Sequence, residues 1–168
     1  MDCFDQKIHV LDQNSSEFSI VNKGYQSKVL HMLKTCFPYS EIKSEDYFKA
    51  PHQRIICLFT TNATNQMEIV GVCFIRQVLN DACFIHSVCI RKSRQGQKCC
   101  DRMFSYLVSN YGGYNLFLSV RVDKYAGQGL PENKAAIKCY SKYGFVFMED
   151  VCTIQADGLN CKMIRRKK

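Results

Sequence analysis

Hydrophobic and polar positions along the chain form short blocks that predict strands and helices. Apolar, β-rich runs at 54–60, 67–76, 83–90 and 116–122 predict four strands, because each run is short and bounded by turn residues. Short polar turns separate the first three runs, which predicts an antiparallel meander. Gly71, inside the second run, is a candidate for a β-bulge.

Apolar residues at helical spacing predict three amphipathic helices. These helices cover residues 25–37, 99–111 and 134–143. Pro38 stops the first helix, glycines stop the other two, and Asn133 is a suitable N-cap for the third.

The order of the elements predicts the fold class. The helix at 99–111 separates the strands 83–90 and 116–122, so these two strands are expected to lie parallel. The order β-α-α-β-β-β-α-β-α-β-β predicts one α/β domain over residues 1–168, with a mixed, mostly antiparallel central sheet and helices on both faces. Its weaker elements are one or two strands at 7–11 and 18–21, a helix at 40–49, and strands at 145–148 and 161–164.

The turn that follows the strand 83–90 is strongly basic. It carries Arg91, Lys92, Arg94 and Lys98, and the next helix begins directly after it. The N-terminus of a helix presents backbone N–H groups and the positive end of the helix dipole. We therefore expect this turn to hold a phosphate group, and specifically the diphosphate of a nucleotide-like cofactor.

Charge and composition narrow the range of partners. The net charge of +8 favours an anionic partner, which could be a cofactor, a nucleic acid or an acidic membrane. The aromatic residues mostly occupy predicted core positions, which argues against nucleic acid. No window holds the roughly 18 apolar residues that a membrane span needs, and the first residues are not typical of a signal peptide. We therefore expect a protein of the cytoplasm or nucleus with no membrane partner.

The chain contains eleven cysteines, which lie mostly in apolar runs. There is no Cys-x-x-Cys pair, so no metal site is predicted, and we interpret the cysteines as reduced, mostly buried thiols. The adjacent pair Cys99 and Cys100 is interpreted as small residues at a helix start. The basic tail 165–168 is interpreted as a solvated end.

One segment carries a more specific pattern. Residues 133–145 read Asn-Lys-Ala-Ala-Ile-Lys-Cys-Tyr-Ser-Lys-Tyr-Gly-Phe. Together with the strand, basic turn and helix upstream, this segment resembles the Gcn5-related N-acetyltransferases (GNAT), whose signature is Asn-x-x-Ala-Ile-x-x-Tyr-x-Lys-x-Gly-Phe. The resemblance covers roughly residues 67–148.

The resemblance implies a site for acetyl-CoA between two parallel strands that splay apart, here 83–90 and 116–122. It implies that the pantetheine arm pairs with the backbone of the first strand and that the diphosphate sits on the basic turn. It also implies that Tyr140 faces the sulfur and that Asn133 contacts the cofactor arm. The cofactor-binding residues implied are Val88, Cys89, Ile90, Arg94, Gln95, Gly96, Gln97, Lys98, Cys99, Cys100, Asn133 and Tyr140.

The basic turn departs from the family pattern Arg/Gln-x-x-Gly-x-Gly/Ala. Three registers are open, and none satisfies every position. The register that starts at Ser93 aligns Gly96 with the central glycine of the pattern. The register that starts at Arg94 aligns Gln97 with it, and the register that starts at Gln95 aligns Lys98 with it. The apolar stripe of the following helix favours the register that starts at Gln95.

The implied chemistry asks for an acid and a neutral amine. The amine attacks the thioester carbonyl, and a nearby acid protonates the departing thiolate. Tyr140 is the candidate acid. His86 is the candidate base, because it shares strand parity with Val88 and Ile90, while Glu68 is a weaker candidate and a base-free, proximity-driven reaction is the third option.

The sequence thus predicts an N-acetyltransferase that moves an acetyl group from acetyl-CoA to a primary amine by direct attack in a ternary complex. The acceptor is left open between a small amine, a lysine and a protein N-terminus. The alternative is a catalytically weak or inactive protein of the same fold that binds CoA or another protein.

Overall fold

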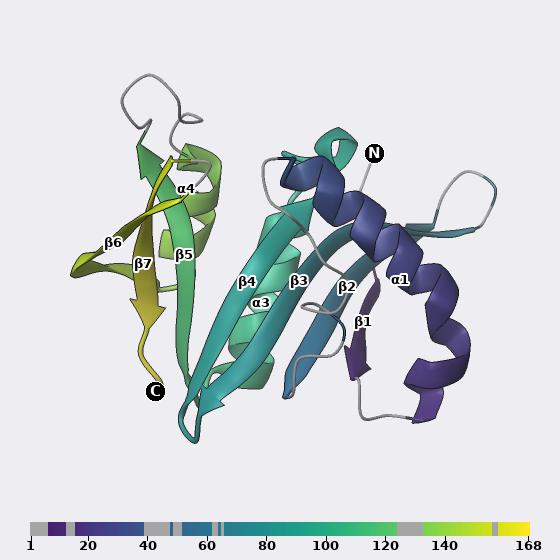
Figure 1. Ribbon diagram of the computed structural model, residues 1–168, viewed down its shortest axis with the longest axis horizontal. Helices are drawn as coiled ribbons and strands as arrows, with labels where there is room; N and C mark the ends of the chain where they lie inside the picture. Colours follow the sequence, from purple (N-terminus) through teal and green to yellow (C-terminus); the bar gives the residue numbers. More distant parts are fainter. Residues whose placement is uncertain are drawn as a thin grey trace. The chain divides into compact units, whose positions relative to one another are not determined.

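The structure is a computed structural model that describes residues 7–12, 16–38, 48, 52–61, 64, 66–123, 133–155 and 158–168. The described strands and α-helices follow one another in the order β-α-β-β-β-α-β-α-β-β (Figure 1), which is the predicted order apart from the helix expected at 40–49. They are β1 (Lys7–Asp12), α1 (Ser16–Cys36), β2 (Gln53–Thr61), β3 (Met67–Leu79), β4 (Ala82–Ile90), the 3-10 turn η1 (Lys92–Arg94), α3 (Cys99–Tyr111), β5 (Asn115–Asp123), α4 (Lys134–Lys142), β6 (Val146–Gln155) and β7 (Gly158–Arg165).

The strands form one mixed sheet in the order β1-β2-β3-β4-β5-β7-β6. β1 with β2, β2 with β3, β5 with β7 and β6 with β7 pair antiparallel. β4 and β5 pair parallel through Ala82–Asn115, Cys83–Leu116 and Phe84–Phe117. The predicted mixed sheet with one parallel pair is confirmed.

The chain divides into two compact units. The first unit comprises Met1–Gln77 and Ile85–Met103, and the second comprises Val78–Phe84 and Phe104–Lys168. β4 is shared, because its first three residues belong to the second unit and the remainder to the first. That residues 1–168 make a single domain stays a prediction.

The core of the first unit has a helix on each face of the sheet. On one face, α1 packs its apolar stripe on β2, β3 and β4 (Figure 1). On the other face, a Cβ added to Gly71 would lie 2.8 Å from Ile90 Cδ1 and 3.0 Å from Met103 Cε of α3. A side chain at this position would force these two side-chain ends to shift, and the sheet register shifts beside Gly71, so the predicted bulge is confirmed. The cluster under α1 is Val29, Met32, Leu33, Ile55, Cys57, Phe59, Ile69, Val72, Phe74 and Cys89.

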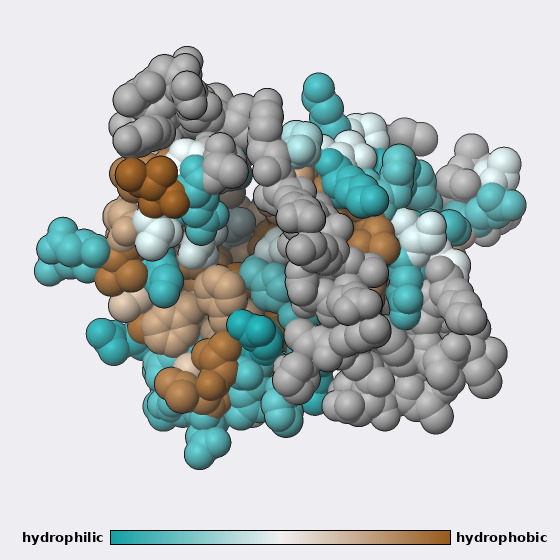
Figure 2. All heavy atoms as spheres, in the orientation of Figure 1, coloured by the Kyte–Doolittle hydropathy of each residue, from teal (hydrophilic) through white to brown (hydrophobic). Residues whose placement is uncertain are grey.

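The second unit has an aromatic core under α4. The Phe104 ring lies 4.7 Å from the Tyr140 ring and 5.8 Å from the Phe145 ring, measured between centroids. Asn133 caps α4, because its side-chain oxygen accepts a hydrogen bond from the Ala136 N–H at 3.2 Å, as predicted. β6 forms the edge of the sheet, and Figure 2 shows hydrophobic surface in the region of β6 and β7.

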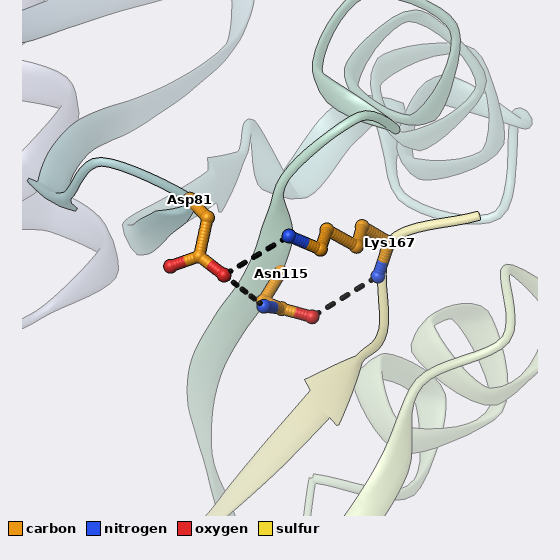
Figure 3. Close-up of polar contacts among 3 residues, drawn as sticks. All are labelled: Asp81, Asn115 and Lys167. Atoms are coloured by element: carbon orange, nitrogen blue, oxygen red, sulfur yellow. Dashed lines mark hydrogen bonds and ion pairs between the residues drawn. The ribbon is translucent and has the colours of Figure 1, made fainter.

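The C-terminal tail of the second unit is attached to the body of that unit (Figure 3). Asp81 Oδ2 accepts hydrogen bonds from Asn115 Nδ2 and from Lys167 Nζ, both at 3.2 Å. The backbone N–H of Lys167 donates to Asn115 Oδ1 at 3.1 Å. The interpretation of the basic tail as a solvated end is wrong at Arg165, which is only 7% exposed, whereas Lys167 keeps a half-exposed side chain.

Two predictions about the N-terminal third need separate comment. Residues 18–21 were expected to be a strand but lie inside α1. Their β-branched residues favour a strand locally, but a helix of 21 residues propagates through them from the amphipathic segment that follows. The predicted helix at 40–49 lies outside the described residues except for Phe48, which is helical.

The interpretation of all cysteines as reduced thiols is wrong for four of them. Disulfides join Cys36 to Cys89 and Cys152 to Cys161. The first pair is separated by 53 residues in sequence, so only the fold brings it together. Within the described part of the chain, the free cysteines are Cys57, Cys73, Cys83, Cys99, Cys100 and Cys139.

Candidate functional site

The basic turn is held in place by backbone hydrogen bonds at both of its ends. At the end of β4, the Arg91 N–H donates to the Val70 carbonyl of β3 at 2.8 Å. The Arg94 N–H closes the 3-10 turn by donating to the Arg91 carbonyl at 2.8 Å. At the other end, the Arg102 N–H donates to the Lys98 carbonyl at 3.0 Å and begins α3. The turn therefore leads without a gap from a strand end into a helix N-terminus.

Two residues of this turn have a left-handed backbone. Gly96 has a φ of +79° and Lys98 has a φ of +58°. Glycine takes this conformation freely, whereas a lysine in it is strained by its Cβ. Lys98 immediately precedes α3, so the strained residue is the one that turns the chain into the helix.

The side chains of the turn are polar and largely on the surface. Arg91 forms an ion pair with Glu68 of β3. Arg94 Nη1 donates to Gln97 Oε1 at 3.3 Å, and Gln95 Nε2 donates to the Ile90 carbonyl at 3.2 Å. Lys92 and Lys98 are exposed. Cationic side chains around the positive end of the α3 dipole suit a group with several negative charges. Glu68, a candidate base, has its carboxylate engaged by Arg91.

β4 contains a bulge that the sequence analysis missed. Ser87 has a φ of +53°, which a regular strand does not allow. His86 stacks on Phe74 in the core under α1, and Cys89 lies in the same core. Ile90 instead approaches Gly71 on the α3 face. His86 and Ile90 therefore point to opposite faces, and the parity that placed them together is wrong, because one extra residue reverses the alternation.

His86 lies in a polar niche inside an apolar core. Its Nε2 lies 2.8 Å from Gln53 Oε1, and its Nδ1 lies 3.2 Å from Ser87 Oγ. Since the Gln53 oxygen can only accept, Nε2 donates and Nδ1 accepts from the serine hydroxyl. Burial, helped by the positive charge of Arg76, lowers the pKa of His86 to about 4. The imidazole is therefore neutral at pH 7, with both ring nitrogens engaged.

The three predicted residues for the cofactor arm lie at the end of β4. Val88 and Ile90 are partly buried, while the Cys89 side chain is 2% exposed. The Cys89 sulfur is bonded to Cys36, the last residue of α1. The strand end is therefore covalently attached to the helix that covers it.

The other two predicted site residues lie in the second unit. Tyr140 is buried within the aromatic core of that unit, and its carbonyl accepts from the Tyr143 N–H at 3.0 Å. The Asn133 side chain caps α4, and its backbone N–H donates to the Arg121 carbonyl at 3.0 Å. The first unit thus holds residues 86–100 of the predicted site, and the second holds Asn133 and Tyr140.

Sequence reasoning missed three partners of the predicted residues. They are Gln53, which binds His86, Ser87, which forms the bulge, and Cys36, which binds Cys89. A glutamine directly before an apolar strand was a usable signal, because a polar side chain that becomes buried needs a hydrogen-bond partner. Ser87 and Cys36 carry no such signal in one sequence.

Comparison with solved structures identifies the fold. The chain superposes on an aminoglycoside 6'-N-acetyltransferase complexed with coenzyme A, with a TM-score of 0.68 and 16% identity, covering 95% of this chain and 96% of that chain. It also matches Escherichia coli ElaA, with a TM-score of 0.70, 15% identity and coverage of 96% and 99%. A chimera of the spermidine N-acetyltransferase SpeG from Vibrio cholerae with hSSAT matches with a TM-score of 0.63, 13% identity and coverage of 97% and 96%.

These similarities establish the fold of the GNAT-type N-acetyltransferases at low sequence identity. No protein-family model and no curated protein matches the sequence. None of the described helices is long and apolar enough to cross a membrane. Among the described residues, no three His, Cys, Asp or Glu side chains are grouped so that they could hold a metal ion.

Proposed function

We propose that this protein is an acetyl-CoA-dependent N-acetyltransferase that transfers the acetyl group directly to a primary amine. The observation that carries the proposal is the turn between β4 and α3. It joins cationic side chains to a helix N-terminus, which is the chemistry that a diphosphate requires. The GNAT fold adds weight, because one solved structure of this fold is a complex with coenzyme A.

We assign the diphosphate to the register that starts at Gln95. In this register Lys98 replaces the central glycine and Cys100 is the small residue. The φ of +58° at Lys98 supports the assignment, since the backbone there is the one that glycine prefers. Gly96 is also left-handed, but it lies three residues before the first residue of α3 and so further from the helix dipole.

The proposed reaction needs few side chains. A neutral amine attacks the thioester carbonyl, the tetrahedral intermediate collapses, and Tyr140 protonates the departing thiolate. A histidine with a pKa of about 4 is a weak base at neutral pH, and both His86 nitrogens are engaged within the first unit. We therefore favour attack driven by proximity over general base catalysis by His86.

The acceptor is proposed to be a primary amine of a small molecule or a protein. Two of the similar structures are named as acetyltransferases of an aminoglycoside and of spermidine, and both of these acceptors are amines. A lysine side chain and a protein N-terminus offer the same nucleophile, so the acceptor panel in the test below includes all of these classes.

The first test measures acetyl-CoA binding by titration calorimetry. Removing one charge–phosphate contact should weaken binding by about tenfold, so Arg94→Ala is expected to raise the Kd by that factor. The control is Lys162→Ala, which removes an equally charged, exposed side chain from β7 of the second unit and should leave the Kd unchanged. If both variants bind as tightly as the wild type, the turn is not the diphosphate site.

The second test measures release of CoA with a panel of polyamines, aminoglycosides, lysine peptides and free peptide N-termini. Turnover with any of them supports the enzyme. The alternative is a binding protein of the same fold, which is favoured by the absence of glycine at the central position of the Gln95 register. Tight acetyl-CoA binding without turnover across the panel would support this alternative.

A further inference from the structure

The Cys36–Cys89 disulfide is placed where it can control the cofactor strand. Cys89 lies between Val88 and Ile90, the residues proposed to pair with the cofactor arm, and two residues after the strained Ser87. Cys36 is the last residue of α1, and the two Cα atoms are 6.1 Å apart. One covalent bond therefore fixes the end of α1 against the part of β4 that the cofactor is proposed to use.

We propose that this disulfide is a reversible redox clamp that orders β4 and thereby raises the affinity for acetyl-CoA. The proposal rests on the function proposed above. When the bond is intact, the strand end is held in one arrangement before the cofactor arrives. When the bond is reduced, binding must order the end of α1 and the bulged strand, and that cost lowers the affinity.

The exchange step requires only a thiol. The thiolate of a low-molecular-weight thiol such as glutathione attacks the sulfur of Cys36, a half-buried residue, and releases Cys89, which takes up a proton as a buried thiol. A second glutathione then attacks the mixed disulfide and frees Cys36. Two thiols thus supply two electrons and two protons, one protein disulfide becomes two cysteines, and glutathione disulfide is formed. The reverse sequence, driven by glutathione disulfide, restores the clamp.

Two of the other cysteines of the first unit, Cys57 and Cys73, are poorly suited to compete in this exchange. Cys57 and Cys73 are buried, and burial raises the pKa of Cys57 to about 12 and also raises that of Cys73. The second disulfide, Cys152–Cys161, bridges the β6–β7 hairpin in the second unit. It offers a matched control, because its reduction leaves the clamp in the first unit intact.

The test compares wild-type protein in oxidised and reduced glutathione buffers. Peptide mapping by mass spectrometry gives the state of each disulfide, and calorimetry gives the Kd for acetyl-CoA. Reduction of Cys36–Cys89 should raise the Kd by about fivefold. Cys36→Ser should bind like the reduced wild type in both buffers, whereas Cys152→Ser should keep the full redox response. An unchanged or lower Kd in the reduced wild type would overturn the clamp, and so would a pair that stays reduced in the oxidised buffer.

Hydrogen exchange separates failure of the clamp from failure of the proposed function. Amides of residues 86–91 and of the last turn of α1 should lose protection on reduction, whether or not acetyl-CoA binds. If neither redox form binds acetyl-CoA, the proposed function fails, and exchange alone judges the clamp. Loss of protection would then support it, and unchanged protection would overturn it. Both measurements on wild-type protein stand even if Cys36→Ser does not fold.

Discussion

Each of the two compact units of the chain holds a large polar side chain out of water, and the two units do so in different ways. In the first unit, Gln53 and His86 satisfy each other, with Gln53 only 2% exposed. In the second unit, Arg165 is 7% exposed, and its Nε donates to the Tyr143 carbonyl at 3.1 Å. Its Nη1 has no hydrogen-bond partner among the described residues. The first unit thus buries a neutral pair, and the second buries a permanent cation that is held largely by backbone.

The surroundings of Arg165 show how a buried cation is accommodated. Tyr143 is the C-cap of α4, so the guanidinium lies at the negative end of a helix dipole. A Cβ at Gly112 would lie 3.6 Å from Arg165 Nη1, and one at Gly144 would lie 3.8 Å from Nε. Two helix-ending glycines therefore line the guanidinium. The two units differ in what stabilises the buried group: a neutral hydrogen-bond partner stabilises Gln53, and the dipole of α4 stabilises Arg165.

The largest effect is expected from removing the buried cation of the second unit. Arg165→Ala leaves a cavity and an uncapped helix end, so the free energy of unfolding should fall by about 3 kcal/mol. Urea denaturation measures it. Arg166→Ala removes an exposed arginine one residue away and should change stability by less than about 0.5 kcal/mol. Equal effects of the two substitutions would mean that Arg165 has no special role.

The neutral pair of the first unit should show itself as a dependence of stability on pH. The pKa of His86 is lowered to about 4 in the folded protein, so between pH 6.5 and 4 the unfolded chain binds the extra proton. Stability should therefore be full above pH 6.5 and fall as the pH drops towards 4, by up to about 3 kcal/mol. Denaturation curves at several pH values measure this fall in stability, which should be absent in His86→Gln. His31→Gln, on the exposed face of α1, should retain it.

The buried tyrosine of the second unit gives a kinetic test. If Tyr140 protonates the departing thiolate, Tyr140→Phe should lower kcat by about 100-fold and leave the Kd for acetyl-CoA nearly unchanged. The control is Tyr143→Phe, which alters the aromatic C-cap of α4, whose ring centroid lies 6.0 Å from that of Phe104. A kcat of Tyr140→Phe within twofold of the wild type would remove Tyr140 from the acid role.

The sequence predicted the elements better than it predicted the site. Local patterns were sufficient for α3, for the Asn133 cap and for the bulge at Gly71, because periodicity, capping and backbone freedom are written in neighbouring residues. The prediction that His86 and Ile90 share a face of β4 was wrong, because the bulge at Ser87 is set by how the strand packs and not by its own composition. The disulfide between Cys89 and Cys36 could not be predicted for a related reason, because 53 residues separate the two cysteines in sequence and only the fold brings them together.

A substitution at Lys98 is expected to have a smaller effect, which is favourable for stability and unfavourable for acetyl-CoA binding. Lys98→Gly relieves a left-handed lysine and should stabilise the protein by about 0.5–1 kcal/mol, while the lost charge weakens acetyl-CoA binding severalfold. Gly96→Ala, at a φ of +79° in open space, should instead destabilise by about 1 kcal/mol and keep the charge. Denaturation and calorimetry on both variants measure the two effects. A destabilised Lys98→Gly would contradict the assignment of strain to this residue.

The smallest effect concerns the exposed cation two residues after Arg165. Lys167 pairs with Asp81 while the two side chains are 50% and 53% exposed, so water and salt screen the attraction. Asp81→Asn should cost no more than about 0.5 kcal/mol at low ionic strength, and the cost should vanish near 0.5 M salt, where the Debye length is only a few ångströms. Denaturation at both salt concentrations measures this, with Glu149→Gln on β6 as an exposed acidic control. A loss of stability that persists in high salt would mean that the hydrogen bonds through Asn115, and not the charge, hold the tail. Arg165 and Lys167 would then differ in the geometry of their hydrogen bonds as much as in their burial.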